Sequence, residues 1–74
     1  VKQIEDIRFI QSVAGLSGLP ESLQEMARIR LERPEATLKE LGENLSHPVG
    51  KSGVNHRLRK ISAVAESLRE ERGE

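Results

Sequence analysis

The chain contains no cysteine, tryptophan or tyrosine, and Phe9 is its only aromatic residue. Without cysteine, neither a disulfide framework nor a thiolate-bound zinc ion can form. This absence fits a protein of a reducing, cytoplasmic compartment. No apolar run approaches the roughly 20 residues that a membrane-spanning helix needs, and no signal peptide is visible. A membrane protein is therefore not expected.

Acidic residues are missing from residues 44–65, although the whole chain has 12 acidic and 12 basic residues. The same segment carries four basic side chains: Lys51, Arg57, Arg59 and Lys60. Because the formal net charge is zero, the other residues must carry the balancing negative charge. A concentrated basic segment of this kind is typical of proteins that bind nucleic acid.

The 74 residues can form one small domain, with an apolar share of 35%. The chain starts at Val1 without an initiator methionine, so we expect it to be a piece of a longer protein. Apolar residues recur at helical spacing in four segments, and none of the segments predicts a strand. The expected helices cover residues 2–14, 20–33, 37–45 and 51–70. Their expected buried stripes are Ile4, Ile7, Ile10 and Val13 or Ala14; Leu23, Met26, Ala27 and Leu31; Leu38, Leu41 and Leu45; and Val54, Leu58, Ile61, Ala65 and Leu68.

Breaking residues separate these segments. Gly15 and Gly18 interrupt the pattern after the first helix. Pro20 suits the first position of the second helix, and Pro34 ends that helix because the residue before a proline avoids helical dihedral angles.

The third and fourth segments have the form of a helix-turn-helix. Thr37 and Glu40 predict a capping box at the start of the third helix. Inside a helix Gly42 costs about 1 kcal/mol relative to alanine, so it predicts a close contact with the next helix. Val54 stands where a branched apolar residue would hold the fourth helix against the third. The turn, residues 46–50, is about two residues longer than in the tightest motifs of this kind.

The fourth expected helix has an apolar side and a polar side. At 100° per residue, Ser52, His56 and Arg59 lie roughly opposite Val54, and Asn55 lies beside them. Arginine pairs with guanine and asparagine with adenine, so this side suits base edges. Lys51 and the backbone N–H groups of the first turn suit a phosphate. The residues predicted to contact DNA are Lys51, Ser52, Asn55, His56, Arg57, Arg59 and Lys60.

Two runs, residues 34–43 and 51–60, resemble the C-terminal domain of the WhiA family. The specific part is the string Lys-Ser-Gly-Val-Asn-His-Arg at residues 51–57, whereas the leucine and arginine pattern before it is typical of any helix. Residues 19–23 and 27–31 fit as well, so the resemblance covers most of the chain. WhiA proteins are bacterial transcription regulators tied to sporulation in filamentous actinobacteria and to cell division more widely.

The resemblance implies an all-α bundle of about four helices with a helix-turn-helix, similar to sigma-factor region 4 type domains. It implies that the chain binds double-stranded promoter DNA on the nucleoid and acts alongside a sigma factor and RNA polymerase. In the full-length protein an N-terminal LAGLIDADG-like domain without nuclease activity would precede it. The matched positions inherit the expectation of DNA contact: Lys51, Ser52, Asn55, His56, Arg57 and Arg59. We assign residues 1–15 to an N-terminal helix, alternatively a linker helix, residues 19–70 to the helix-turn-helix domain and residues 71–74 to a frayed tail.

Other uses of these residues stay open. The basic side of the fourth helix could be only a solvated surface, and Asn55 could cap or pair within the protein. Gly53 could let another backbone, of DNA or of protein, approach closely. Arg30 lies near the apolar stripe of its helix and is expected to serve the structure by pairing with a glutamate. His47 and His56 are too few ligands to predict a metal site.

A different class of function also fits the chain. The apolar side of residues 1–14 could bind a protein, which would make the chain an adaptor for a sigma factor, RNA polymerase or its own N-terminal domain. An enzyme is not expected, because the sequence shows no nucleophile with a base, no carboxylate pair and no metal-ligand set. No cofactor is expected either.

Overall fold

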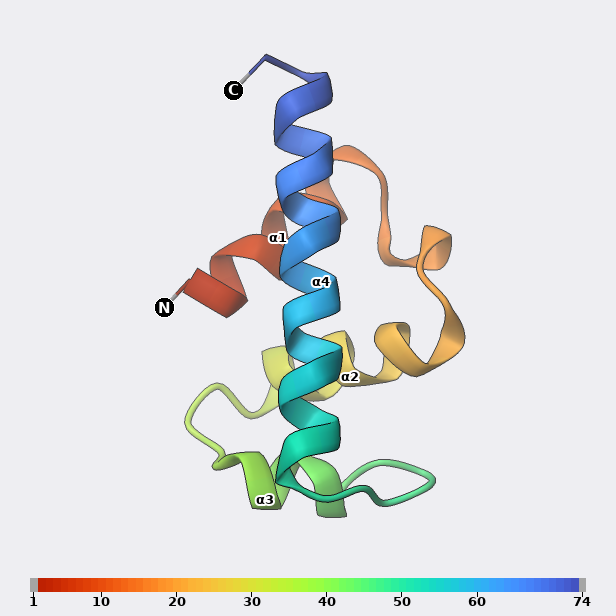
Figure 1. The fold of residues 1–74 in the computed structure, drawn as a ribbon, viewed down its shortest axis with the longest axis vertical. Helices are drawn as coiled ribbons and strands as arrows, with labels where there is room; N and C mark the ends of the chain where they lie inside the picture. Colours follow the sequence, from red (N-terminus) through yellow and green to blue (C-terminus); the bar gives the residue numbers. More distant parts are fainter. Residues whose placement is uncertain (1, 74) are drawn as a thin grey trace.

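The computed structural model describes residues 2–73 as four α-helices and one short 3₁₀ helix, η1 (Figure 1). In chain order these are α1 (Lys2–Val13), η1 (Leu16–Gly18), α2 (Glu21–Glu32), α3 (Leu38–Glu43) and α4 (Lys51–Glu71). No strand occurs within the described residues. The expected all-α fold class is therefore confirmed, and each expected helix agrees with its observed bounds to within two residues.

The longest helix, α4, is the axis of the molecule. Its 21 residues span about 31 Å at 1.5 Å per residue, most of the 36 Å length of the domain. Each of the other three α-helices packs against it. In Figure 1, α1 crosses its upper half, α2 crosses its lower half and α3 lies at its lower end. Every other helix therefore contributes to holding α4 in place.

Apolar side chains from all four α-helices meet in one core along α4. The α4 contribution has the expected spacing, with Val54, Leu58, Ile61 and Ala65 each at most 2% exposed. Facing them are Ile7, Ile10, Leu19, Leu23, Met26, Ala27, Leu41 and Leu45. Five residues expected in the buried stripes are only partly buried: Ile4, Val13, Leu31, Leu38 and Leu68. Ala14, the alternative to Val13, is exposed.

The first helix is part of this core. Ile7 is 0% and Ile10 is 1% exposed, so the apolar side of α1 is used within the domain. A linker helix standing apart from residues 19–70 does not fit this packing. Residue Val1 lies outside the described part of the chain.

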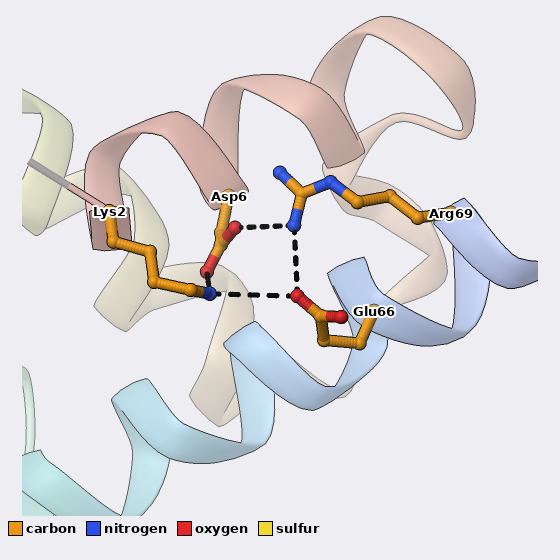
Figure 2. Close-up of polar contacts among 4 residues, drawn as sticks. All are labelled: Lys2, Asp6, Glu66 and Arg69. Carbon is orange, nitrogen blue, oxygen red and sulfur yellow. Dashed lines mark hydrogen bonds and ion pairs between the residues drawn. The ribbon is translucent and has the colours of Figure 1, made fainter. Parts of the chain in front are cut away.

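A cluster of four charged side chains ties α1 to the C-terminal half of α4 (Figure 2). Asp6 accepts hydrogen bonds from Lys2 Nζ at 2.9 Å and from Arg69 Nη1 at 2.8 Å. Glu66 Oε1 lies 3.6 Å from the same nitrogen of Lys2 and 3.2 Å from that of Arg69. The Arg69 guanidinium also lies 4.7 Å from the centre of the Phe9 ring, a cation–π contact. The sequence does not show the pairing of Asp6 with Arg69, because 63 residues separate the two.

Asp6 is fully buried. Burial alone would raise the pKa of its carboxyl group, but hydrogen bonds from Lys2, Arg69 and Ser62 together outweigh it and lower the pKa below the ordinary 3.8. Asp6 is therefore held as a carboxylate. Its negative charge is balanced by Lys2 and Arg69 where α1 meets α4.

Arg30 takes the buried place on α2 that was expected for Leu31. It is 9% exposed, and its Nη1 donates to the carbonyl oxygens of Pro34 at 2.7 Å and Arg33 at 3.5 Å. Its Nε donates to Gln3 Oε1 at 3.2 Å. The expected structural use is confirmed, but the expected glutamate partner is wrong. The backbone carbonyls of Arg33 and Pro34, directly after α2, take that role.

Two expected helix ends also need correction. Pro20 is the N-cap of α2 rather than its first residue. Glu71 belongs to α4 rather than to a frayed tail, and Arg72 donates its backbone N–H to the Leu68 carbonyl at 3.1 Å. Glu74 lies outside the described residues.

Candidate nucleic-acid interface

The start of α3 is capped as expected. The Glu40 backbone N–H donates to Thr37 Oγ1 at 3.2 Å, and the Thr37 backbone N–H donates to Glu40 Oε1 at 2.8 Å. Hydrogen bonds to the Glu40 carboxyl group from the backbone N–H of Thr37 and from the Thr37 side chain lower its pKa. The reciprocal pair satisfies two donors that a helix start leaves open, so α3 begins at a defined residue.

Gly42 is the point of closest approach between α3 and the segment that follows it. A Cβ atom at this position would lie 2.2 Å from the Val49 carbonyl oxygen and 3.1 Å from Val54 Cγ2. The Val49 backbone N–H also donates to the Gly42 carbonyl at 3.3 Å. Both expectations, a close contact at Gly42 and a packing role for Val54, are confirmed.

Gly53 has a different environment from the one expected. A Cβ atom there would meet the Val49 side chain at 3.2 Å. The glycine therefore makes room for a side chain of the turn. The close approach of a DNA backbone to Gly53 stays a prediction.

The loop between α3 and α4 is fastened to α2. Glu25 accepts hydrogen bonds from the Ser46 backbone N–H at 3.1 Å and from Ser46 Oγ at 3.2 Å. These two bonds lower the pKa of the Glu25 carboxyl group, with Arg28 and His47 adding to the effect. The long loop is therefore held in place by its contact to α2. This contact helps to fix the position of α4 relative to α3.

The first turn of α4 carries positive charge and no acid. Gly50 is its N-cap and offers no side-chain hydrogen bond, and the turn holds Lys51 but no aspartate or glutamate. A helix start usually favours negative charge, because its N–H groups point outward and its dipole is positive there. The unused N–H groups and the lysine together suit an anion such as a phosphate.

The seven side chains predicted to contact DNA lie along the first three turns of α4. Lys51, Ser52, His56, Arg59 and Lys60 are exposed, and Asn55 and Arg57 are half-buried. Within residues 2–73, none of the seven forms a side-chain hydrogen bond or ion pair with another residue. Asn55 in particular does not use its amide to cap or pair inside the domain. Their role in binding DNA stays a prediction.

Arg57 and Arg59 leave α4 on different sides. Two residues along a helix correspond to about 160° around it. Arg57 borders an open hollow beside α2 and the α3–α4 loop, together with Arg28 and His47. Arg59 borders a second hollow beside α1, together with Lys2 and Gln3. The two arginines therefore have different neighbours on opposite flanks of α4.

Sequence reasoning missed the neighbours that surround this face. Arg28 belongs to a different helix, and the sequence does not pair His47 with either α2 or Arg57. Lys39 borders a third hollow together with Lys51 and Thr37. The charge pattern along residues 44–65 could not reveal Arg28 or Lys39, because both stand outside that segment and only the fold brings them near it.

The described residues contain neither a group of metal ligands nor a membrane-spanning helix. Among the described residues, no three histidine or acidic side chains are grouped so that they could hold a metal ion. No helix in residues 2–73 is long and apolar enough to cross a membrane.

Comparison with known proteins identifies the family. The model of the "WhiA C-terminal HTH domain" matches residues 1–65. The chain belongs to the WhiA family. The match includes α1, in agreement with the packing of Ile7 and Ile10 in the core.

Curated WhiA proteins are similar over nearly the whole chain. A "Probable cell division protein WhiA" of Clostridium acetobutylicum is 61% identical over 71 residues, which cover 96% of this chain and 22% of that protein. The protein of the same name from Enterococcus faecalis is 61% identical over 70 residues, with coverages of 93% and 22%. The chain thus spans about a fifth of the length of these relatives. No solved structure matches it.

Proposed function

We propose that this domain binds double-stranded DNA by placing the N-terminal half of α4 in the major groove. The observation that carries the proposal is the outward side of α4. Ser52, His56 and Arg59 are exposed there and lack partners among residues 2–73, while the opposite side of the same helix is buried in the core. Polar side chains held on a fixed helix and left without intramolecular partners are suited to base edges.

The residues divide by the contacts they can make. Arg59 and Asn55 suit guanine and adenine edges, respectively. Ser52 and His56 lie on the same outward side and can reach bases or the sugar-phosphate backbone. Lys51, at the start of α4, suits a phosphate, and contacts of that kind position the protein without reading sequence.

The family supports a wider role. The relatives carry the name of a cell division protein, and we propose that this chain serves the same process as part of a longer bacterial regulator. In that role it would recognise promoter DNA on the nucleoid in the cytoplasm and regulate transcription in cell division or sporulation. A sigma factor, RNA polymerase and the N-terminal LAGLIDADG-like domain are its proposed protein partners.

A salt titration tests the proposal. Binding to a fluorescently labelled 30-base-pair duplex would be followed by anisotropy between 50 and 200 mM salt. If Lys51, Arg57, Arg59 and Lys60 neutralise phosphates, the logarithm of the affinity falls against that of the salt concentration with a slope of about −3 to −4. Lys51→Ala should weaken binding to all sequences alike and bring the slope about one unit closer to zero.

Base reading is tested on a site selected from a randomised duplex pool. Arg59→Ala and Asn55→Ala should each cost about 1–3 kcal/mol on that site and relax selectivity at one position. An even loss across all sequences would show that the base-reading side is assigned wrongly.

The adaptor function remains the alternative. The apolar side of residues 1–14 is less available to a partner than the sequence suggests, because Ile7 and Ile10 are buried within the domain. A flat salt dependence with DNA would favour the adaptor and contradict DNA binding.

A further inference from the structure

An open hollow lies beside α4, between α2 and the α3–α4 loop. Its lining comes from three segments: Arg57 on α4, His47 on the loop, and Glu21, Glu25 and Arg28 on α2. It lies on the Arg57 flank of α4, and Arg59 points about 160° away from this flank. The residues around the hollow are therefore spatially distinct from the side of α4 proposed to read bases.

The donor side chains of this hollow have no hydrogen-bond partner among the described residues. Within the described chain, Arg28, His47 and Arg57 make no side-chain hydrogen bond or ion pair. The negative groups differ from each other. Glu25 is engaged by two hydrogen bonds from Ser46, whereas Glu21 is exposed in the first turn of α2. The free donors of two arginines and a histidine can bind an anion, and the negative charges of Glu21 and Glu25 oppose that binding.

We propose that this hollow receives a backbone phosphate of the bound DNA, with Arg28, His47 and Arg57 as its donors. The proposal rests on the proposed function. A helix in a major groove about 12 Å wide has a sugar-phosphate backbone on each side. Since the hollow adjoins the proposed reading helix on one flank, one of these two backbones would pass beside it. Arginine is well matched to phosphate, because its planar guanidinium donates two parallel hydrogen bonds.

This assignment changes the expected role of Arg57. It becomes a residue that positions the domain on DNA, together with Arg28 of α2, and it does not read sequence. The DNA-binding surface then includes α2 and the α3–α4 loop as well as α4. The hydrogen bonds from Ser46 to Glu25 acquire a second consequence, since they hold the loop that carries His47 at the hollow.

Arg28→Gln tests the proposal, with Arg8→Gln as its matched control. Both arginines are exposed on helices and lack side-chain partners within residues 2–73, so both substitutions change the net charge equally. Binding would be measured by anisotropy with a 20-base-pair duplex of mixed sequence. Arg28→Gln should lower affinity about threefold to tenfold and reduce the salt slope by about one unit. Arg8→Gln should change affinity less than about twofold, since it does not line the hollow. Arg57→Gln should behave like Arg28→Gln on every sequence.

Removing a negative charge from the hollow should raise DNA affinity, whereas removing a positive charge should lower it. Glu21 and Glu5 each stand in the first turn of a helix, but only Glu21 lines the hollow. Glu21→Gln should therefore raise affinity for the same duplex about twofold to fivefold at low salt, and Glu5→Gln should have a smaller effect.

The outcomes separate this proposal from the one it rests on. If Arg28→Gln and Glu21→Gln match their controls while Lys51→Ala still weakens binding, the phosphate site is wrong and DNA binding stands. If the unaltered domain shows no salt-dependent binding to any duplex, both proposals fail. A gain for Glu21→Gln together with a loss for Arg28→Gln supports the phosphate site, because a general effect of net charge would act equally at the control positions.

Discussion

At the scale of single residues, the absence of a side chain at Gly42 sets how closely α3 approaches the start of α4. Replacing it with alanine would place a methyl group 2.2 Å from the Val49 carbonyl oxygen, and a backbone atom cannot move aside as a flexible side chain can. We expect Gly42→Ala to lower the free energy of unfolding by about 1–3 kcal/mol. Urea denaturation followed by circular dichroism measures this.

Gly18→Ala is the control for that measurement. No heavy atom would lie within 4 Å of its new Cβ atom, so its stability should change by less than about 0.5 kcal/mol. Equal stability of the two variants would mean that α3 and the Val49 segment do not pack as described.

Residues whose roles depend on near neighbours could be predicted from the sequence. Thr37 and Glu40 are three positions apart, and their capping box follows from that spacing alone. Arg30 shows the limit. Its burial could be suspected from its place on the stripe, but one of its partners is Gln3, 27 residues away, and only the packing of α1 on α2 brings the two together. The charge pattern predicts a binding role for Arg57. Its neighbour Arg28 lies outside the basic segment, and only the packing of α2 beside the loop brings the two arginines to one hollow.

At the scale of elements, α4 has two halves with different roles. Its N-terminal half carries the basic side chains proposed to contact DNA, and its C-terminal half is joined to α1 through Asp6, Glu66 and Arg69. The Asp6 contacts should therefore stabilise the long helix at the end away from the side chains proposed to contact DNA. Asp6→Asn keeps the size of the side chain but removes its charge, and we expect it to lower the free energy of unfolding at pH 7 by about 1–3 kcal/mol.

The pH dependence of stability tests the same contact. The pKa of Asp6 is lowered in the folded protein, because hydrogen bonds from Lys2, Arg69 and Ser62 outweigh the opposing effect of its burial. A lowered pKa contributes stability that is present above the ordinary value of 3.8 and is lost as the pH falls through the folded-state value. Glu25 and Glu40 act in the same direction.

Acid titration of stability isolates the part due to Asp6. Between pH 6 and pH 2, the difference in free energy of unfolding between the unaltered chain and Asp6→Asn should shrink once the pH falls below about 4. DNA affinity at pH 7 should change much less than stability, because the cluster lies on the C-terminal half of α4. A difference in stability that stays constant down to pH 2 would show that Asp6 does not gain its stability as a carboxylate.

At the scale of the whole molecule, the fold class followed from the pattern of apolar residues because every α-helix has one side facing a single core. The relative placement of the helices did not follow from that pattern. The role of α1 illustrates this, since its periodicity was equally compatible with a linker helix and with a packed one. The burial of Ile7 and Ile10 decides between them. The outline of the surface proposed to face DNA depends on the same placement, because its flanks come from α1, α2 and the α3–α4 loop.

The charge of the whole domain argues that one copy binds DNA weakly. Its net charge is zero, so the basic side of α4 acts against the negative charge elsewhere, and one helix can read only a few base pairs. Two copies joined by a flexible linker of about 40 residues, which spans roughly 35 Å, could occupy two sites one helical turn apart. We expect this tandem protein to bind a two-site duplex about 10²–10⁴-fold more tightly than the single domain does, measured by anisotropy at fixed salt.

Two controls separate this gain from a simple increase in charge or mass. On a duplex with one site, the tandem protein should gain only about twofold, because its second copy has no specific site to occupy. A tandem protein with Lys51→Ala and Arg59→Ala in one copy should lose most of the gain on the two-site duplex, since only one reading helix is then intact. If the unaltered tandem protein binds the two-site duplex no more tightly than the single domain does, α4 does not present an independent reading surface. In that case, DNA binding by the domain would depend on contacts that lie outside α4.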